Sequence, residues 1–439
     1  MNKTVVAGAS NVDITPKESH FLFGYPFVDR MSKGTHDALL SSALYISDCN
    51  TQILFISNNV IYVTKESVKR IRRKISLKTG IPDSHILIAA THTHSAPVTA
   101  ELVISGNDPV VPSVDSNYLN FMEDGTVEAA CKAYSNAEPA RIGFATGDAS
   151  GVGTNRHNPE GPKDMEVPAM LVRNLNNEFI ACMLICNMHP TILHEDSKLY
   201  SGDFPYFTGK SIQEQLGKTC TVVYFTGTAG NQSPRHVTKS NTFEEAERIG
   251  NIVSEAILSR SVENLNYFTD IQISVIQKFI DLPKRKFPPV EWAEQHRDTS
   301  KKLFEHLQKS STDPREIRTA EVNWFGSEEL LYLSTLAQSD ELNKAYKTIL
   351  PVEIQVIKVG NLAFIAWPGE IFVEYGLALK KQFNNIFMIT YANGELQGYI
   401  VTKEAHEKGF YEAGNSFFEY LSGEIMLEQT IEMLKELGQ

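Results

Sequence analysis

Cysteine is scarce in this chain of 439 residues, and its pattern excludes two classes of protein. The five cysteines are an odd number with no CxxC pair: Cys49, Cys131, Cys182, Cys186 and Cys220. A fold built on disulfides and a zinc cluster held by cysteines are therefore both excluded. Unpaired cysteines fit a reducing compartment, and the cytoplasm is the location that we expect.

Positive charge is also in short supply. Lys and Arg together number 41 against 53 Asp and Glu, which gives a formal net charge of -12. No basic patch or arginine-rich arm interrupts this acidic balance. The sequence therefore lacks the cluster of positive charge that binding to a nucleic acid or to an anionic membrane surface requires.

Long hydrophobic runs and the common nucleotide motifs are absent as well. No run approaches membrane-spanning length, and too few apolar residues precede Asn11 and Asp13 to form the core of a signal peptide. The chain has no His-Glu-x-x-His motif and no P-loop, and Gly151-Val-Gly153 lacks the third glycine of a dinucleotide fingerprint. We therefore expect no transmembrane segment, no leader and no bound dinucleotide.

What recurs instead is a short apolar run that ends in a cluster of Gly, Pro, His or small polar residues. Five such runs occur, at residues 85–90, 179–186, 221–225, 362–366 and 386–389. Continuous runs rich in Ile, Val and Phe predict strands that are buried on both faces. Ligands collect beyond the carboxyl ends of such strands, so we expect all five polar clusters at one sheet edge.

Helices are predicted between and after these strands. Thr64 caps a segment with an apolar face that ends at Gly80, which makes a βαβ unit with parallel strands. Thr242 begins a second helix, through about Leu258, with the spacing of a capping box. The predicted fold class is α/β, with a mixed, largely buried β-sheet core flanked by helices.

The composition shifts between about 282 and 350, where prolines precede charged helical segments at 292–309 and 315–342. We interpret this stretch as a helical insertion. It is either a lid over the site or a plain helical layer on the surface.

Three histidines and one glutamate stand at the ends of predicted strands. His92 and His94 are two residues apart, so both point to one face if the extended backbone continues past the strand. His189 follows the next deep strand, and Glu370 follows Pro368-Gly369. Taken singly, each has an ordinary alternative: a chance His-x-His spacing, a hydrogen-bonded core histidine, or a glutamate in the first turn of a helix.

Together these residues predict a metal site. Two or three imidazoles and one carboxylate that converge on one edge are the usual ligands of a catalytic zinc, with one position left open for water. The nitrogen and oxygen donors suit Zn²⁺ and do not exclude Mn²⁺ or Fe²⁺. Such a site would supply hydroxide at neutral pH.

Four further residues have both a functional and an ordinary interpretation. Ser233, within Gly230–Pro234, suggests a serine nucleophile, but the segment lacks the Gly-x-Ser-x-Gly spacing and is typical of a turn. Arg156 fits an ordinary surface arginine. Tyr399 and Tyr411 fit aromatic core packing, although their stretch is rich in Asn, Gly, Tyr and Thr.

The order of the motifs resembles that in the N-terminal catalytic region of the neutral/alkaline non-lysosomal ceramidase family. The motifs that carry this resemblance are Ala7–Thr15, Gly34–Asp37, Thr91–Ser95, Thr154–Arg156, Asn187–Thr191, Gly230–Pro234, Pro368–Glu370, Gly398–Thr402 and Tyr411–Ser416. The chain ends soon after the last motif, so we expect a bacterial-type member without the C-terminal β-sandwich domain of the secreted enzymes.

The resemblance implies an amidase with one catalytic zinc. Carried over motif by motif, the zinc ligands are His92, His189, Glu370 and Tyr399, and the tyrosine ligand comes from the family alone. The residues around the scissile amide are His94, Arg156, Ser233 and Tyr411. Ligands spread so widely along the chain need one continuous unit, so we expect residues 1–439 to form a single catalytic domain.

The expected reaction is attack of zinc-activated water on an amide carbonyl, with the zinc, Tyr411 and His94 as candidates to hold the oxyanion. His94 is also the expected proton carrier. The motif Gly-Asp-Val-Ser-Pro-Asn of the family reads Gly-Asn-Gln-Ser-Pro-Arg at residues 230–235 here. We therefore expect a small-molecule or lipid-like N-acyl substrate, ceramide-like or smaller. The alternatives are a binding relative without catalysis and a serine hydrolase that uses Ser233.

Overall fold

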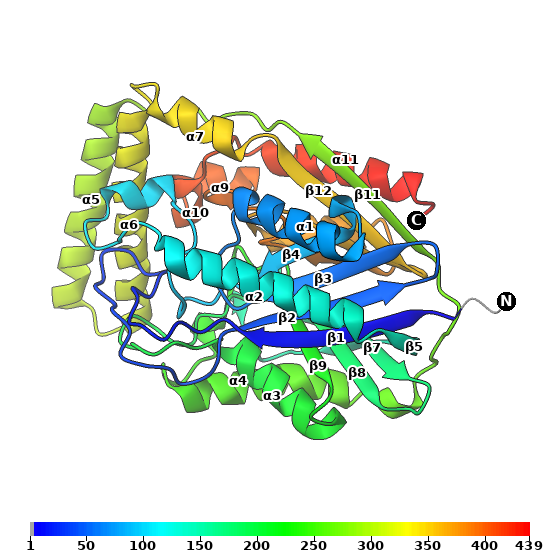
Figure 1. The fold of residues 1–439 in the computed structure, drawn as a ribbon. Helices are drawn as coiled ribbons and strands as arrows, with labels where there is room; N and C mark the ends of the chain where they lie inside the picture. Colours follow the sequence, from blue (N-terminus) through cyan, green and yellow to red (C-terminus); the bar gives the residue numbers. More distant parts are fainter. Residues whose placement is uncertain (1–3) are drawn as a thin grey trace.

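The computed structural model describes residues 4–439, apart from the side chains of Pro314 and Arg315. Residues 1–3, the first residues of the stretch expected to lack a leader, lie outside the described part. The larger of the two main sheets contains β1 (Val6–Asp13), β2 (Leu40–Ser47), β3 (Gln52–Asn58), β4 (Ile86–Ala90), β5 (Glu138–Asp148), β7 (Glu166–Asn174), β8 (Phe179–Cys186) and β9 (Thr221–Thr226). Its strand order is β4-β3-β2-β1-β5-β7-β8-β9 (Figure 1).

The eight-stranded sheet folds back on itself. Its two halves are joined at β1 and β5 over only two residue pairs, Val6–Pro139 and Ala7–Glu138. β4 and β9 stand at opposite ends of the strand order, yet they contact each other. The hydroxyl of Thr226, at the end of β9, donates to the carbonyl of Thr91 at 2.8 Å. The carboxyl ends of β4, β8 and β9 therefore meet.

A second sheet contacts these strand ends. It contains β11 (Ile273–Ile280), β12 (Val352–Val359), β13 (Leu362–Ala366) and β15 (Ile386–Ile389), in that order. Directly after β15, the amide of Thr390 donates to Thr226 and the carbonyl of Tyr391 accepts from Ala90, at 2.9 and 3.1 Å. All five predicted strands are present, but they belong to two sheets, so the expectation of a single sheet edge is corrected.

An apolar core joins the two sheets. The ring of Phe55 on β3 lies 6.4 Å from that of Phe225 on β9 and 5.4 Å from that of Phe364 on β13. Cys182 and Cys186 lie inside β8 and are buried, as expected. Burial on both faces explains why these strands read as continuous apolar runs.

Helices cover the outer faces of the sheets. α1 (Lys65–Thr79) and α2 (Ser116–Ser135) lie on one side of the large sheet, and α3 (Phe204–Leu216) and α4 (Phe243–Leu258) on the other (Figure 1). α8 (Val373–Lys380) and α11 (Ser422–Glu436) flank the second sheet. The Thr64 hydroxyl caps α1, Gly80 ends it in a left-handed conformation, and β3 and β4 are parallel across it. The predicted α/β fold class is confirmed.

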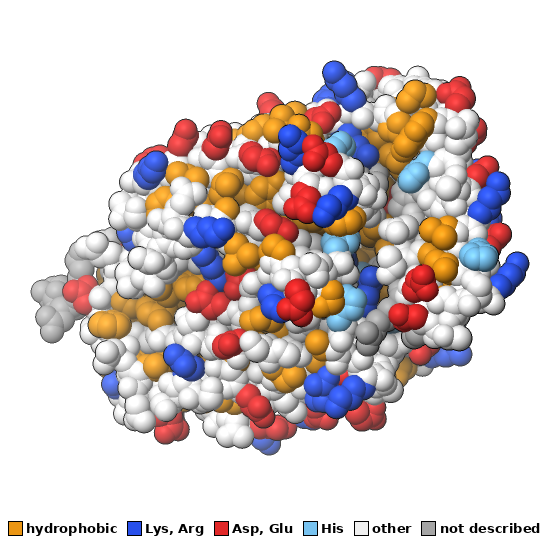
Figure 2. Space-filling view, turned by 180° about the vertical axis from the view of Figure 1, so that it is seen from behind, with side chains coloured by type: hydrophobic (Ala, Val, Ile, Leu, Met, Phe, Trp, Pro, Cys, Tyr) orange, Lys and Arg blue, Asp and Glu red, His pale blue; other side chains and the backbone are white. Residues whose placement is uncertain are grey.

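The stretch 282–350 forms three helices: α5 (Val290–Ser310), α6 (Pro314–Leu336) and α7 (Glu341–Ile349). α5 and α6 pack as a pair at the end of the molecule that is remote from both termini (Figure 1). The face in Figure 2 is hollowed beside this pair, and histidine side chains gather along the hollow. That these helices act as a lid stays a prediction. Within residues 4–439, no helix is both long and apolar enough to cross a membrane.

Candidate metal centre and active site

The three predicted histidines lie where strand ends meet. His92 follows β4 in a left-handed conformation, with a φ of 68°, so extended backbone does not continue past Ala90 and the expected strand alternation is wrong there. The rings converge nevertheless. The Nε2 atoms of His92 and His94 are 3.4 Å apart, and one ligand nitrogen from each of His92, His94 and His189 lies within 4.8 Å of the other two.

Backbone carbonyls fix the tautomers of two of these histidines. Nδ1 of His92 lies 3.0 Å from the carbonyl oxygen of Ile61, and Nδ1 of His189 lies 2.7 Å from that of Ala229. A carbonyl oxygen can only accept, so each Nδ1 carries a proton and donates it. In the neutral rings, Nε2 of both histidines therefore presents a lone pair to the interior, which is how protein histidines are held for metals.

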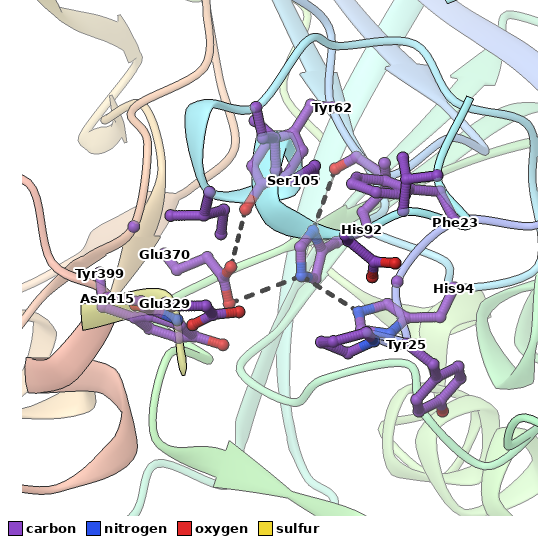
Figure 3. Close-up of a pocket in the computed structure, with 18 of the residues that line it drawn as sticks. Phe23, Tyr25, Tyr62, His92, His94, Ser105, Glu329, Glu370, Tyr399 and Asn415 are labelled. Atoms are coloured by element: carbon purple, nitrogen blue, oxygen red, sulfur yellow. Dashed lines mark hydrogen bonds and ion pairs between the residues drawn. The ribbon is translucent and has the colours of Figure 1, made fainter. Parts of the chain in front are cut away.

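Glu370 and Tyr399 are brought together by a short parallel ladder. β14 (Glu370–Ile371) pairs with β16 (Tyr399–Ile400), with Glu370 opposite Tyr399. Oε2 of Glu370 lies 3.1 Å from Nε2 of His189 and 3.6 Å from Nε2 of His92. The hydroxyl of Tyr62 donates to Oε1 of Glu370 at 2.7 Å (Figure 3). One carboxylate oxygen is thus held by a tyrosine while the other faces the imidazoles.

The electrostatics of this cluster fit a bound cation. Burial lowers the pKa of His189 and keeps that of His94 well below its usual value. Burial alone would raise the pKa of Glu370, but it lies well below its usual range because His92 and His189 face the carboxylate. With both rings in the neutral form, the Nε2 lone pairs of His92 and His189 face the ionised carboxylate of Glu370. A metal ion would satisfy all of them, so the residues present fit the predicted metal.

His94 differs from the other two histidines. Its Nδ1 is buried and has no hydrogen-bond partner among the described residues. The backbone at Gly24 passes so close, with a φ of 124°, that an added Cβ would lie 2.5 Å from the His94 ring. Tyr25 packs its ring against the imidazole, with centroids 5.2 Å apart. His94 is therefore held by packing, with Nδ1 beside the backbone of Gly24 and Nε2 facing His92.

Arg156 and Ser233 come from a second short ladder. β6 (Thr154–Asn155) pairs antiparallel with β10 (Gln232–Ser233), and Arg156 directly follows β6. The Arg156 guanidinium lies over the Tyr399 ring at 5.3 Å. The Ser233 hydroxyl accepts from the backbone N–H of Arg235 at 3.2 Å. Within residues 4–439 no basic side chain hydrogen bonds to this hydroxyl, so a proton acceptor for a serine nucleophile is not in place.

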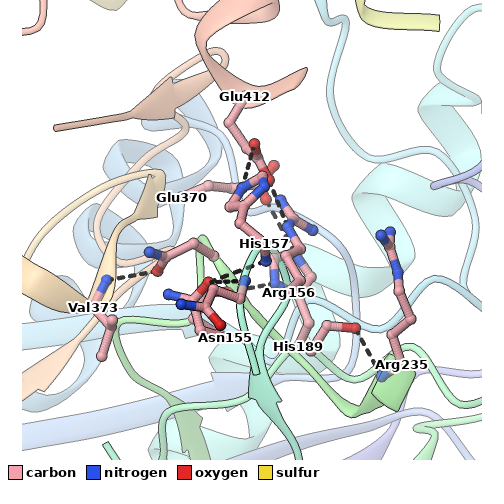
Figure 4. Close-up of polar contacts among 12 residues, drawn as sticks. Asn155, Arg156, His157, His189, Arg235, Glu370, Val373 and Glu412 are labelled. Carbon is pink, nitrogen blue, oxygen red and sulfur yellow. Dashed lines mark hydrogen bonds and ion pairs between the residues drawn. The ribbon is translucent and has the colours of Figure 1, made fainter. Parts of the chain in front are cut away.

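A buried ion pair fixes Arg156. Its Nε donates to Oε1 of Glu412 at 2.5 Å, and Nε2 of His157 lies 2.8 Å from the other carboxylate oxygen (Figure 4). Burial opposes ionisation, yet the attraction of Arg156 and His157 lowers the pKa of Glu412 to about 2. Glu412 directly follows Tyr411, which begins α10 (Tyr411–Asn415) with its ring 6.1 Å from that of Tyr399. The pair therefore ties the arginine to the segment that carries Tyr411.

Replacing Glu412 by glutamine is expected to lower the free energy of unfolding by about 3 kcal/mol at neutral pH, because it leaves Arg156 buried beside a neutral group. The folded pKa lies below the unfolded value of about 4.3, so this stabilisation is full above that pH and is lost as the pH falls toward 2. Urea unfolding at several pH values measures it. The exposed Glu428→Gln serves as control, and a difference from the native protein that stays constant down to acidic pH would contradict the assignment.

The predicted residues line two adjoining cavities. The first is lined by His92, His94, Glu370, Tyr399 and Tyr411 among others, and the second by His94, Arg156, His189, Ser233, Tyr399 and Tyr411 among others. All eight residues singled out in the sequence therefore border one or both of two cavities that share part of their walls. His94, Tyr399 and Tyr411 belong to both walls, so the histidine cluster lies where the two cavities meet.

Sequence reasoning missed several residues of this region. Tyr62 lies in a segment that reads as part of a buried strand, although its hydroxyl holds Glu370. Tyr391 stacks on the ring of His92, with centroids 4.0 Å apart. Glu329 on α6 lines the first cavity, where burial raises its pKa to about 8. No motif marks any of the three, because each reaches the site only through tertiary packing.

Comparison with known proteins finds similarity to neutral ceramidases. Residues 6–204 match the family model described as neutral/alkaline non-lysosomal ceramidase, N-terminal. The neutral ceramidase of Pseudomonas aeruginosa is 22% identical over 466 aligned positions, which cover 94% of this chain and 69% of that protein. Neutral ceramidase B of Dictyostelium discoideum is 24% identical over 45% of this chain and 30% of that protein.

Solved structures show the same fold. The crystal structure of the neutral ceramidase from Pseudomonas aeruginosa aligns with a TM-score of 0.76 and 16% identity, covering 98% of this chain and 74% of that one. A ceramidase complexed with C2 aligns with a TM-score of 0.74 and 15% identity, covering 97% and 74% of the two chains. The resemblance predicted from the motifs is thus confirmed, and the likeness of fold extends well beyond residue 204.

Proposed function

From the similarity of this chain to the neutral/alkaline non-lysosomal ceramidase family, we propose that it hydrolyses the amide bond of an N-acyl compound with the help of one bound zinc ion. The observation that carries the proposal is the set of lone pairs from His92, His189 and Glu370 that converge between two cavities. Relatives named as ceramidases, one of them complexed with C2, favour a lipid-like amide as substrate.

The residues that would hold the metal are His92, His189, Glu370 and Tyr399. When bound there, zinc would polarise a carbonyl group and lower the pKa of a water molecule to about 7. Tyr62 and the backbone carbonyls of Ile61 and Ala229 orient three of these ligands through their second polar atoms. Such partners fix the ring and carboxylate orientation that a metal site requires.

The remaining residues would act on the substrate. Nε2 of His94 lies beside the ligands, 3.4 Å from Nε2 of His92, so His94 would take a proton from the attacking water and return it to the leaving nitrogen. Tyr411 borders both cavities and would donate a hydrogen bond to the developing oxyanion. Arg156, held by Glu412, would orient Tyr399 and the neighbouring part of the substrate.

The experiment that tests the function joins metal analysis to a substrate screen. X-ray fluorescence of the purified protein should detect about one zinc per chain. N-acyl amides with chains from acetyl to palmitoyl, ceramides included, should be hydrolysed in a chain-length-dependent way that a chelator abolishes and added zinc restores. Absence of both metal and hydrolysis would favour the binding relative instead.

Replacing Ser233 by alanine separates this proposal from a serine hydrolase. The hydroxyl receives a hydrogen bond from a backbone N–H and lacks a basic partner among the described residues. We therefore expect the variant to keep its activity within about tenfold, as for loss of one neutral hydrogen bond, and the native protein to resist fluorophosphonate labelling. Covalent labelling at Ser233, with activity that survives chelation, would overturn the zinc mechanism.

A further inference from the structure

The two cavities that meet at the histidine cluster have opposite charge. Among the described residues, the wall of the first holds three acidic side chains and no Lys or Arg, whereas the wall of the second holds three arginines and no Asp or Glu. The acidic side chains are Asp108, Glu329 and Glu370, and the arginines are Arg156, Arg235 and Arg318. A substrate that spans both cavities therefore meets a cationic surface at one end only.

Arg235 is the unusual member of this set. Its guanidinium forms no ion pair or hydrogen bond with any residue of the described chain, and only its backbone nitrogen is bonded, to Ser233 (Figure 4). The side chain is partly buried, and burial together with repulsion from Arg156 and Arg318 lowers its pKa to about 10. A cation withdrawn from water is unfavourable unless an anion pairs with it.

The other two arginines are neutralised by the chain itself. Arg156 is paired with Glu412, as described above. Arg318, on α6, donates to Glu321 at 2.7 Å and to Glu195 at 3.2 Å. His194, also in this wall, is kept neutral because burial and Arg318 lower its pKa. The second cavity thus presents one cation, Arg235, whose counter-ion the described chain does not supply.

We propose that the amine half of the substrate carries an anionic group that Arg235 binds, which makes this protein an amidase for N-acylated amino acids or related N-acyl anions. This inference rests on the proposed function. The acyl half would fill the first cavity, whose apolar wall includes Phe23, Leu102 and Ile104. The volume of the second cavity is about 130 Å³, against the 10–15 Å³ or so that one water molecule needs, so a carboxylate, sulfonate or phosphate has room.

The planar guanidinium favours such a group in particular. It can donate two parallel hydrogen bonds to a carboxylate, a sulfonate or a phosphate, and charge-assisted bonds of this kind are about twice as strong as neutral ones. Arg235 lies two residues beyond Ser233 and borders the same cavity as His94 and His189. The anion would therefore sit near the amide nitrogen, as the carboxylate of an N-acyl amino acid does.

The test compares matched substrates that share a decanoyl chain. The zinc-loaded protein is assayed with N-decanoylglycine, N-decanoyltaurine and N-decanoylphosphoethanolamine, each against the neutral N-decanoylglycinamide. At least one anion should be hydrolysed with a kcat/KM about tenfold or more above that of the neutral amide. In Arg235→Gln this ratio should fall to about one, Arg235→Lys should keep part of it, and the exposed control Arg73→Gln should keep all of it.

Binding provides a second readout that does not need turnover. Calorimetry should give tighter binding of N-decanoylglycine than of N-decanoylglycinamide, and Arg235→Gln should abolish the difference. Equal hydrolysis of neutral and anionic amides would overturn the inference and leave the proposed function standing. Binding of the anion through Arg235 without any hydrolysis would overturn the proposed function and leave only the anion site at Arg235. An absence of hydrolysis together with binding that does not depend on Arg235 would overturn both.

Discussion

Alanine in place of His189 is expected to release the bound metal and to lower kcat/KM for amide hydrolysis on the order of 10³-fold or more. The imidazole supplies Nε2 to the cluster while its Nδ1 is anchored on Ala229. A catalytic metal contributes several kcal/mol of transition-state stabilisation, and about 4 kcal/mol corresponds to a thousandfold change in rate. Zinc content by mass spectrometry and initial rates on one N-acyl amide measure the two effects together.

The matched control is His306→Ala, which removes an exposed histidine of α5 that lines neither cavity. It should keep both metal and activity. Zinc should also raise the thermal unfolding midpoint of the native protein, because a ligand present at about 1,000 times its Kd stabilises the folded state by about 4 kcal/mol. The proposed ligand set would be contradicted if His189→Ala kept its zinc, or if zinc did not change the thermal unfolding midpoint of the native protein.

Alanine in place of His94 is expected to separate metal binding from catalysis. Loss of a general acid or base lowers rates by about 10²–10⁴-fold, and His94 is the histidine of the cluster with a buried nitrogen left unpartnered. Because His92, His189, Glu370 and Tyr399 stay in place, the variant should still bind about one zinc per chain. The measurement is kcat on an N-acyl amide beside the zinc stoichiometry of the same sample.

Geometry makes this variant informative. Nε2 of His94 lies 3.4 Å from Nε2 of His92, close enough for His94 to serve as a third nitrogen ligand. Loss of zinc from His94→Ala would therefore reassign the residue from proton transfer to metal binding. His189→Ala, analysed in parallel, shows what the loss of a ligand looks like.

Local features of the fold could be predicted from the sequence because they depend on neighbouring residues. The apolar runs identified five strands, Thr64 and Gly80 marked the ends of α1, and the motif order indicated the resemblance to neutral ceramidases. The identities of the site residues were also accessible, since polar clusters that end buried strands stand out against their apolar surroundings. The carboxyl ends of strands are where such residues become functional.

The spatial arrangement of these residues could be learned only from the tertiary structure. The sequence could not show that β4 and β9, at opposite ends of one sheet, converge through Tyr391 and Thr390, because these contacts join segments far apart in the chain. The left-handed conformation at His92, whose amide donates to the carbonyl of Val60, likewise has no signal in the local sequence.

The sequence by itself determined which side chains are candidates for the chemistry. His92, His94, His189 and Glu370 can be recognised because each is a possible metal ligand that follows a predicted buried strand. Only the tertiary structure decided their protonation and their surroundings. Carbonyls from other segments set the tautomers, Tyr62 holds Glu370, and no residue of the described part of the chain pairs with the Arg235 guanidinium. The physical reason is that pKa, desolvation and ion pairing depend on distances of a few ångströms between residues that the sequence keeps far apart.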